Sequence, residues 1–528
     1  MFNRLGKNIN PLLYDYSGLV LDKVLRGSFW LSLGSIITSF LGFVYWLLVS
    51  PIVPPETVGR AATILALESL FLSTISLGIP TGIMRFLGRE YARQDTSTLG
   101  KYFYSPLIFL FVLNVIAALI FLFLGLFASL IPLDSESVLF ALILMLLGMN
   151  GWPLVITSFF NSILRTEYVS LTQVVMGLSR IIIGVPLVYF GLGFHGVMIG
   201  YVVAVLLSDV LLLICSGYQL RRLGVRFSTS LQAVKESLKA GMATWIQSVL
   251  ALIGQWFGVI GLRGFVGSYE TGTYFVAYSI TAGLLSLPIN MLSLMFPVLS
   301  SMEDGRKRSM NRATRMASAI MYPLAFVLIA YPYIIPSLLG ETYLPASTPI
   351  MILSVGFLLA PLVNSYTYYA YAVGKYTEVT VIGLTGNVSR LILYLILIKN
   401  YSEIGAAVAF ALGFVPSLLS VIFLSRRAAY KLDLVGSLKM LLIPFCPYLI
   451  TLLLRLPPAF GIPFILILPY LLYARFNMIT KKDLEDLSTA FLSKNTLVTL
   501  SPYLKPILFL KMFYRILKGW KNCQDHRR

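Results

Sequence analysis

The stretch VVMGLSRIIIGVPLVYF, residues 174–190, is apolar almost throughout, yet it has an arginine, Arg180, near its centre. A second stretch, LTGNVSRLILYLILI at 384–398, places Arg390 directly after a serine in the same way. The two arginines lie 210 residues apart. Because a charge inside an apolar membrane segment is costly, two such charges in matching surroundings indicate a duplicated unit.

The composition indicates an integral membrane protein. Of the 528 residues, 58% are hydrophobic and only 12% are charged, and the mean hydropathy is +0.84. A soluble domain has roughly a quarter of its residues charged. The three cysteines and two histidines lack metal-ligand spacing, so we expect no disulfide framework and no metal site. The first apolar block, at 27–50, is too long for a signal peptide.

The apolar blocks predict an all-α membrane protein with about fourteen transmembrane helices, because roughly 20 apolar residues cross the hydrocarbon as a helix. A first set of spans is predicted near 27–50, 59–84, 102–131, 138–163, 168–190 and 193–217. A second set is predicted near 240–262, 271–299, 316–338, 346–372, 376–398 and 402–424. A closing pair is predicted near 436–454 and 459–474.

Basic residues predict the orientation. Lys and Arg gather in alternate connections, such as 221–226, 305–315 and 425–431, whereas the opposite side holds only Arg60, Arg263, Lys399 and Arg455. The positive-inside rule then places both termini in the cytoplasm, and we expect the plasma (inner) membrane. The net charge of +19 is explained by basic loops that face an anionic leaflet, so nucleic-acid binding is not expected.

Weak matches between the two halves support the duplication. At an offset of 213 residues, LRGSFW from Leu25 meets LKAGMA from Leu238, Gly59 meets Gly272 and Glu90 meets Glu303. At 210, Arg165 meets Lys375, and HGVMIG then lies beside IGAAVA after a further shift of one residue. Six spans per half predict two bundles related by a pseudo-two-fold axis along the membrane normal, which is a transporter architecture.

The predicted organisation has six parts. They are a cytoplasmic N-terminal segment at 1–26, an N-terminal six-helix bundle at 27–217, a cytoplasmic linker at 218–239, a C-terminal six-helix bundle at 240–424, an extra helix pair at 436–474 and a basic amphipathic cytoplasmic tail at 475–528. Lysines recur every few residues in the tail, which is typical of a helix on the membrane surface.

Two segments resemble a known family. The segment LLGETYLPASTPIMILSVGFLLAPLVN at 338–364 resembles the Gly-x-x-Tyr segment that opens the tenth span of polysaccharide flippases. The segment 372–413, with its Ile-Gly-Ala-Ala turn, resembles their eleventh and twelfth spans. Over about 20–475 the chain resembles Wzx-type lipid-linked oligosaccharide flippases of the multidrug/oligosaccharidyl-lipid/polysaccharide (MOP) superfamily.

This resemblance implies a transporter and not an enzyme. Its substrate would be a polyprenyl-(pyro)phosphate-linked oligosaccharide, moved from the inner to the outer leaflet for surface polysaccharide or glycan assembly. Membrane lipids and glycan-assembly enzymes would be the other partners. We expect no cofactor, and a coupling ion, H⁺ or Na⁺, stays open.

Two other functions remain as alternatives. A multidrug or cation antiporter of the same superfamily would use a carboxylate in the first bundle, although the first span at 27–50 has no charged residue. A membrane glycosyltransferase or polymerase would need catalytic carboxylates or a large outer domain. The predicted outer loops are short and contain no Asp-x-Asp, and the sequence has no phosphate-binding loop of the G-x-x-x-x-G-K type.

Polar residues inside the predicted spans are the candidates for lining a substrate cavity or coupling transport. They are Glu68, Gln247, Gln255, Asn290, Arg180, Arg390, Asp209 and Asn364. A central arginine costs about 2.5–3.5 kcal/mol, so each arginine needs a partner or water. Arg180 could pair with Asp209 or Glu68, or it could contact substrate. Spans 1, 2, 7 and 8 line the cavity in the resembled superfamily, which favours Glu68 as a coupling or gating carboxylate.

Three further arginines lie at the predicted span ends. Arg85 and Arg89 end the second span on the cytoplasmic side, and Arg263 ends the seventh on the outer side. They are predicted either to anchor the helices at the interface or to contact substrate phosphate at the mouths of the cavity.

Overall fold

The computed structural model describes residues 33–127, 133–148, 151–293, 295, 299, 302, 304–476 and 478. These residues form helices and contain no β-strand. The predicted N-terminal segment at 1–26 lies outside the described residues, as does nearly all of the predicted amphipathic tail. The same holds for the sequence matches that involve Leu25 and Glu303.

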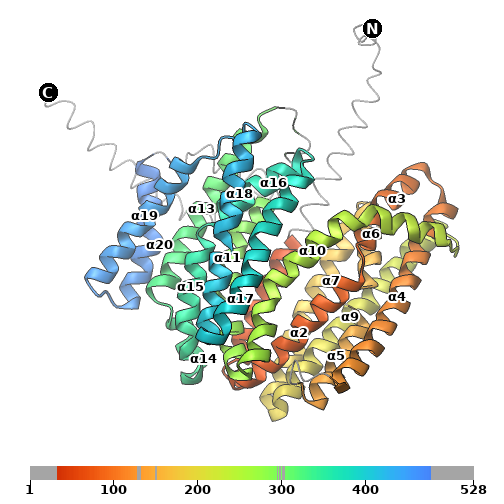
Figure 1. Ribbon diagram of the computed structural model, residues 1–528, viewed down its shortest axis with the longest axis horizontal. Helices are drawn as coiled ribbons and strands as arrows, with labels where there is room; N and C mark the ends of the chain where they lie inside the picture. Colours follow the sequence, from red (N-terminus) through yellow and green to blue (C-terminus); the bar gives the residue numbers. More distant parts are fainter. Residues whose placement is uncertain are drawn as a thin grey trace, which may run out of the picture. The chain divides into compact units, whose positions relative to one another are not determined.

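The first bundle begins with a helix at Leu33–Val49. It continues with α2 (Pro55–Ile75), α3 (Ile79–Arg93), α4 (Thr96–Phe127), α5 (Ser135–Leu147), α6 (Pro153–Ser162) and α7 (Thr166–Ser179). Two π-helical segments, η1 (Arg180–Gly184) and η2 (Val188–Leu192), flank the short α8 (Val185–Leu187) before α9 (Gly193–Arg222). These elements occupy one side of Figure 1, where α2, α4, α5, α7 and α9 run alongside one another.

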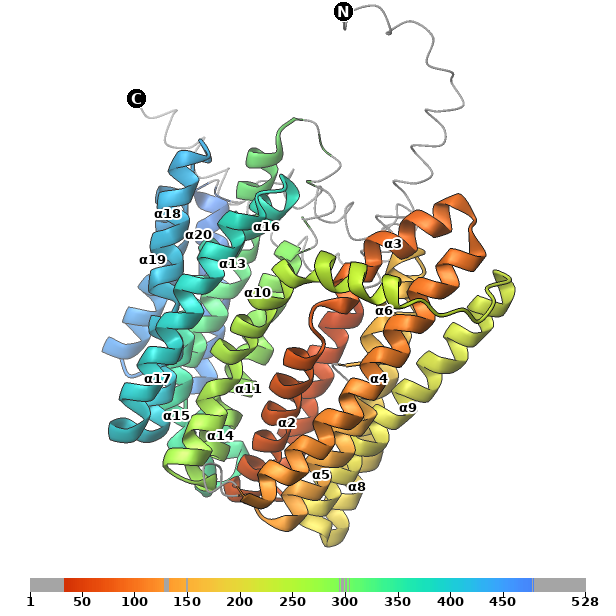
Figure 2. The same ribbon diagram turned by 45° about the vertical axis from the view of Figure 1, so that its right-hand side comes forward.

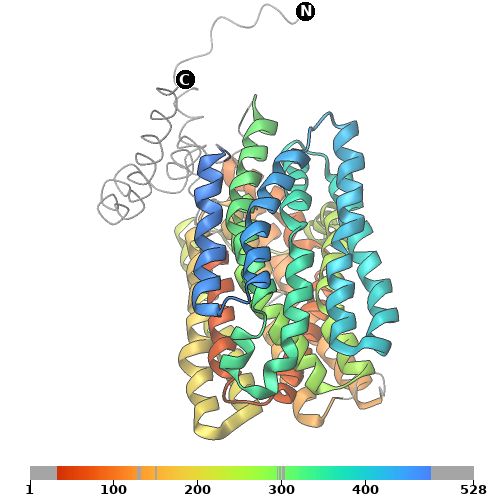
Figure 3. The same cartoon turned by 90° about the vertical axis from the view of Figure 1, so that its left-hand side faces the viewer.

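The second bundle repeats this order. It contains α10 (Leu231–Phe265), α11 (Ser268–Ser293), α13 (Arg306–Ala330), α14 (Ile334–Leu339), the 3-10 helix η3 (Glu341–Ala346), α15 (Ser347–Phe357), α16 (Ala360–Ala372), α17 (Tyr376–Leu412) and α18 (Phe414–Arg427). The closing helices are α19 (Leu434–Leu453) and α20 (Pro458–Arg475). Figure 3 shows α19, in blue, beside α13, in green.

The helices account for the fourteen predicted spans. Within the described residues, nine helical runs are long and apolar enough to cross a membrane, and a bent pair at Glu341–Ala372 makes ten. Two of the nine runs, Thr166–Arg222 and Tyr376–Arg427, are 57 and 52 residues long and each holds two spans. The shorter apolar helices Leu33–Val49 and Ser135–Leu147 supply the remaining two. The fold class is therefore confirmed.

Three spans that were predicted as single helices are broken at a proline, and a fourth, predicted at 316–338, is divided between α13 and α14. The span predicted at 59–84 is split into α2 and α3, the one at 138–163 into α5 and α6, and the one at 346–372 bends by 45° between α15 and α16. At each of these three breaks a proline lies at the first or second position of the second helix. These prolines are Pro80, Pro153 and Pro361. Proline has no N–H to continue the preceding helix but fits the first turn of a new one.

Backbone geometry confirms that the halves correspond. Gly193, the first residue of α9 directly after η2, has φ 48° and ψ −120°. Ser402, inside the continuous hydrogen-bonded run of α17, has φ 49° and ψ −131° and marks the same kink 209 residues later. The predicted boundary between spans 11 and 12 is therefore at this kink, although helical hydrogen bonding continues across it.

The two bundles meet at the first turns of α2 and α11. A Cβ built on Gly59 would lie 2.0 Å from the carbonyl oxygen of Ser268, and one on Gly272 would lie 1.8 Å from that of Pro55. The two contacted residues, Pro55 and Ser268, are separated by the same 213 residues as Gly59 and Gly272. A reciprocal contact of this kind is what a two-fold axis requires, so the predicted pseudo-symmetry axis passes here.

Inside each bundle, the first helix packs on the fifth with matched large and small side chains. Gly177 faces Leu41 and Gly184 faces Tyr45, with a Cβ on each glycine reaching 2.7 Å and 3.0 Å from the partner side chain. In the second bundle the sizes are exchanged: a Cβ on Gly254 would lie 2.1 Å from Asn387 and one on Gly258 would lie 3.0 Å from Tyr394. A third pair, Gly34 with Gln173, corresponds to Gln247 with Gly383.

Helix α10 links the bundles. In Figure 2 its first part runs across α6 and α3 before the helix descends between α2 and α17. Gly241 packs against Gly78, where a Cβ would lie 2.0 Å from a carbonyl oxygen. The indole Nε1 of Trp245 donates to the carbonyl oxygen of Thr74 at 2.9 Å. Helix α10 therefore packs directly on the first bundle.

Candidate functional site

A cavity of about 590 Å³ lies between the two bundles. Its walls come mainly from Leu33–Val49 and α2 on one side and from α10 and α11 on the other, with contributions from η1 and α9. The resemblance predicted these four helices as the main lining. Four of the eight candidate residues, Glu68, Arg180, Gln255 and Asn290, are brought together in this cavity.

Arg180 lies on the cavity wall because η1 continues the helix of α7 toward α9. Its guanidinium carbon is 4.8 Å from the ring centre of Tyr201 on α9. Its Nε is buried and has no hydrogen-bond acceptor among the described residues. Within this same part of the chain no ion pair joins Arg180 to Asp209 or Glu68, so the ring is its principal neighbour. A cation on an aromatic face gains about 0.5–2 kcal/mol, which offsets part of its insertion cost.

Arg390 occupies the corresponding place in the second bundle but is enclosed by protein. Its guanidinium carbon lies 4.2 Å from the ring centre of Phe410, the counterpart of Tyr201, and 4.5 Å from that of Phe414. Its Nε donates to the carbonyl oxygen of Phe410 at 3.1 Å, and Nη1 donates to Asn387 at 3.4 Å. Arg390 does not line the cavity between the bundles.

Glu68 is the cavity's only carboxylate among the described lining residues. It lies on α2, is 3% exposed, and accepts a hydrogen bond from the hydroxyl of Ser69 at 3.3 Å. Glu68 and Arg180 thus place opposite charges on the wall formed by the first bundle. Gln255 and Asn290 supply neutral polar groups from the second bundle.

Aromatic rings fill the seam beside these polar groups. Trp46 of the first bundle meets Phe275 of the second edge to face, with ring centres 5.1 Å apart. Phe275 in turn stacks with Trp256 at 6.3 Å. Tyr201 and Tyr278 also line the cavity. Such rings offer flat apolar faces beside polar edges. This surface suits a ligand that has both apolar and polar parts.

Three further candidates lie away from the cavity. Asn364 donates to the carbonyl oxygen of Ala360 in its own helix at 2.9 Å, and Gln247 donates to the hydroxyl of Tyr371 at 3.2 Å. Asp209 is buried within α9, at 6% exposure. Sequence alone could not separate these residues from Gln255 and Asn290, because all of them lie in apolar spans.

The three arginines proposed for the cavity mouths are also outside its lining. Arg85 is exposed on α3, and Nε of Arg89 pairs with the carboxylate of the adjacent Glu90 at 2.5 Å. Arg263 donates to the hydroxyl of Ser268 at the end where the bundles meet. A direct role for them in substrate binding stays a prediction.

The relationship to known proteins follows from a match to a family model. A family model described as "Polysaccharide biosynthesis protein" matches residues 24–303, more than half of the chain. The chain belongs to this polysaccharide biosynthesis protein family. An uncharacterized membrane protein of Methanocaldococcus jannaschii is similar to it, with 23% identity over 439 residues that cover 78% of this chain and 85% of the relative.

Solved structures share the fold of this chain. The lipid II flippase MurJ in an inward closed conformation matches with a TM-score of 0.69 and 15% identity, over 86% of this chain and 99% of MurJ. An inward-facing multidrug resistance transporter of the MATE family matches with a TM-score of 0.58 and 15% identity, over 75% and 96% of the two chains. The family and the fold together place the chain among the MOP-superfamily transporters.

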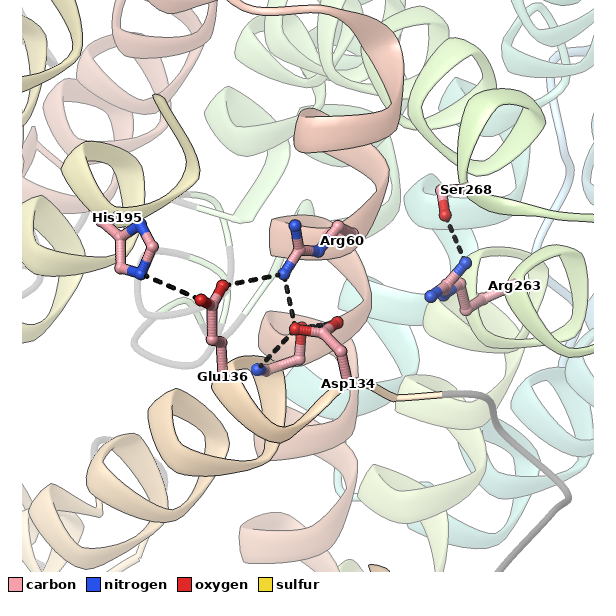
Figure 4. Close-up of polar contacts among 7 residues, drawn as sticks. Arg60, Asp134, Glu136, His195, Arg263 and Ser268 are labelled. Carbon is pink, nitrogen blue, oxygen red and sulfur yellow. Dashed lines mark hydrogen bonds and ion pairs between the residues drawn. The ribbon is translucent and has the colours of Figure 1, made fainter. Parts of the chain in front are cut away.

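The chain also has a charge cluster that the sequence did not predict (Figure 4). Nη2 of Arg60 on α2 lies 2.6 Å from Asp134 and 3.4 Å from Glu136, and the guanidinium covers the ring of Phe194 at 3.9 Å. His195 Nε2 is 3.6 Å from Glu136. This Arg60 cluster joins α2, α5 and α9 at the end where Gly59 meets Gly272. Its only sequence signal was the concentration of opposite charges in short loops.

Asp134 is the central acid of the Arg60 cluster. It caps α5 by accepting from the backbone N–H of Ser137 at 3.3 Å, and it accepts from that residue's hydroxyl at 2.8 Å. Partial burial alone would raise the pKa of Asp134, but the hydrogen bonds from Ser137 and the charge of Arg60 together hold it below its usual value. The carboxylate is therefore ionised at neutral pH.

Proposed function

We propose that the chain flips a polyprenyl-(pyro)phosphate-linked oligosaccharide from the inner to the outer leaflet. The observation that carries the proposal is Arg180, a cation with a buried, unmet N–H donor on the wall of the cavity between the bundles. Moving a phosphate through hydrocarbon without compensation is prohibitive, and a guanidinium supplies the paired donors that phosphate oxygens accept. Membership in the polysaccharide biosynthesis family supports this substrate class.

The other cavity groups suit the rest of such a substrate. Serines, Gln255 and Asn290 can exchange hydrogen bonds with sugar hydroxyls, and Trp46 and Trp256 can cover the apolar faces of sugar rings. In this proposal both termini are cytoplasmic and no chemical bond is made or broken. The protein acts as a transporter in the plasma membrane and holds no catalytic residue.

Deleting the gene tests the proposal directly. Lipid-linked glycan should accumulate on the inner leaflet, surface glycan should fall, and re-expression of the parent chain should reverse both effects. Leaflet location is measured by accessibility of the glycan to an impermeant lectin or glycosidase in sealed right-side-out vesicles. Normal surface glycan in the deletion strain, with no accumulation inside, would refute the flippase function.

A cation antiporter is the second candidate, and Glu68 is the observation that favours it. A buried carboxylate in the first bundle's cavity wall could exchange a proton or Na⁺ for an organic cation. In that case the deletion strain should keep its surface glycan and become more sensitive to cationic drugs. Glu68→Gln should reproduce the drug sensitivity without any change in glycan export.

A further inference from the structure

A second cavity, of about 520 Å³, opens between the start of α13 and the connection that joins α18 to α19. It lies apart from the cavity between the bundles and shares no lining residue with it. Four of the side chains around it are cationic: Lys307, Arg308, Arg315 and Lys431. Asp433 is the only acid among its described lining residues.

The single acid is already engaged. Asp433 Oδ1 accepts from the backbone N–H of Gly436 at 2.9 Å and so caps α19. Its other oxygen lies 3.8 Å from Nε of Arg315. That Nε is buried and has no hydrogen-bond acceptor within the described chain. One carboxylate therefore faces four cations, and the excess positive charge in a partly enclosed pocket attracts anions.

The pocket's framework is held in place without a ligand. Lys307 Nζ donates to the carbonyl oxygen of Ala429 at 2.8 Å, and Asn311 Nδ2 donates to that of Lys431 at 3.0 Å. The buried Tyr430 donates to Asn311 Oδ1 at 2.8 Å and lies 3.1 Å from the hydroxyl of Ser365 on α16. Binding would therefore require little ordering of the backbone, which favours affinity.

Two cationic side chains remain available. Arg308 and Lys431 are exposed, and no ion pair engages either of them among the residues that the structure describes. The N-terminus of α13 adds donors, since Gly305 offers no side-chain cap to this 25-residue helix. Backbone N–H groups and the helix dipole favour a negative charge at that position.

We propose that this pocket binds a phosphate-bearing anion. The N–H donors of an arginine guanidinium have the geometry to pair with two phosphate oxygens, and a lysine ammonium adds a mobile point charge. Basic pockets at the ends of membrane helices bind phospholipid headgroups. The volume admits a headgroup or a pyrophosphate. A ligand that contacts both Arg308 and Lys431 would brace α13 against the connection leading to α19, so binding stabilises the folded chain. The proposal is independent of what the central cavity transports.

The test measures the melting temperature of the purified full-length chain in an uncharged detergent. Sodium pyrophosphate and dihexanoyl-phosphatidylglycerol are titrated separately, with sodium chloride of equal ionic strength and dihexanoyl-phosphatidylcholine as their respective blanks. We expect a saturable rise for the parent, because a ligand bound only to the folded state stabilises it. The double variant Arg308→Gln/Lys431→Gln should weaken the apparent affinity at least about tenfold, because it removes one or two charge-assisted hydrogen bonds to the ligand.

The matched control is Arg221→Gln/Arg222→Gln, which removes the same charge from the last turn of α9. It should bind like the parent. A rise with both probes, or with phosphatidylglycerol alone, supports the site, and the second pattern identifies the source as a lipid headgroup. The site is refuted if neither probe raises the melting temperature above its blank, or if the control loses as much affinity as the pocket variant.

Discussion

Arg180 and Arg390 hold corresponding positions but have different surroundings. Each guanidinium lies over an aromatic ring of the following span, Tyr201 or Phe410. Arg390 is also hydrogen-bonded to Asn387 and a carbonyl oxygen, whereas Arg180 faces the cavity with a donor unmet. We therefore assign a structural role to Arg390 and propose a substrate contact for Arg180.

Lysine and glutamine substitutions separate the two roles. Arg390→Lys should lower membrane abundance and cost about 1–3 kcal/mol, because an ammonium leaves Asn387 or the Phe410 carbonyl unpaired. Arg180→Gln should keep the parent's abundance and lose glycan export, while Arg180→Lys should retain part of the export. Abundance is measured by fluorescence of a tagged chain after detergent size exclusion. Full export by Arg180→Leu would contradict a substrate contact.

Ser402 has a backbone conformation that belongs to glycine. Its φ of 49° and ψ of −131° carry a steric cost for any residue with a Cβ, and its counterpart in the first bundle is Gly193. Ser402→Gly should therefore raise the unfolding free energy by about 1 kcal/mol, visible as a higher melting temperature. Gly193→Ser should lower it by a similar amount. A lower melting temperature for Ser402→Gly would show instead that ordinary helix entropy dominates this site.

At the scale of elements, the Arg60 cluster ties α2, α5 and α9 together through charges that are partly exposed to solvent. The side chains of Arg60, Asp134 and Glu136 are 27%, 41% and 51% exposed. Exposed ion pairs contribute at most about 1 kcal/mol, so the cluster aligns these helices more than it stabilises them. Its location beside the contact of the bundles makes it part of the closed end of the transporter.

The pH dependence of this cluster follows from Asp134. Because the folded-state pKa of Asp134 lies below its ordinary value, its contribution is fully present above about pH 4 and is lost as the pH falls through the lowered pKa. Asp134→Asn should keep the helix cap, cost less than about 1 kcal/mol at pH 7, and flatten the fall in melting temperature below pH 4. An equally steep fall in both proteins would exclude Asp134 as a source of acid sensitivity.

At the scale of the whole molecule, the contact of Gly59 and Gly272 sets how closely the bundles approach. Gly59→Ala would place a methyl group 2.0 Å from the Ser268 carbonyl oxygen, so the bundles must separate at that end. Tyr343 strengthens the same closure by donating across the seam to the Val53 carbonyl oxygen at 2.8 Å. Closure here is the expected counterpart of opening at the other end in alternating access.

Gly59→Ala should therefore favour the state that is open at this end. A cysteine that replaces Ser279 in the cavity should react about tenfold faster with an impermeant thiol reagent added from that side. A shift of about 1.4 kcal/mol in the free-energy difference between the closed and open states is enough for this change. Gly217→Ala is the matched control, because a Cβ on Gly217 meets nothing within 4 Å. Equal labelling rates in Gly59→Ala and the control would show that the bundles absorb the methyl group without opening.

The sequence was sufficient for the architecture but only partly so for the site. Hydropathy and charge asymmetry located the spans, and the repeat offset predicted a pseudo-symmetry axis, because both depend on patterns that extend over many residues. The breaks at Pro80, Pro153 and Pro361 were missed because apolar composition continues through them. Gln255 and Gln247 lie two turns apart on α10, yet only Gln255 lines the cavity, and no pattern within one helix determines which turn faces the other bundle.

The exchanged large and small side chains have a consequence for biogenesis. Two bundles of the same design emerge from the ribosome in succession, so the first helix of one could dock on the fifth helix of the other. Tyr45 against Tyr394 would collide, and Gly258 against Gly184 would leave a void. The positions one and three turns away distinguish the same partners, since Leu41 would meet Asn387 and Gln247 would meet Gln173. The exchanged sizes therefore favour docking of each first helix on the fifth helix of its own bundle during membrane insertion. They disfavour the exchange of helices between the two bundles.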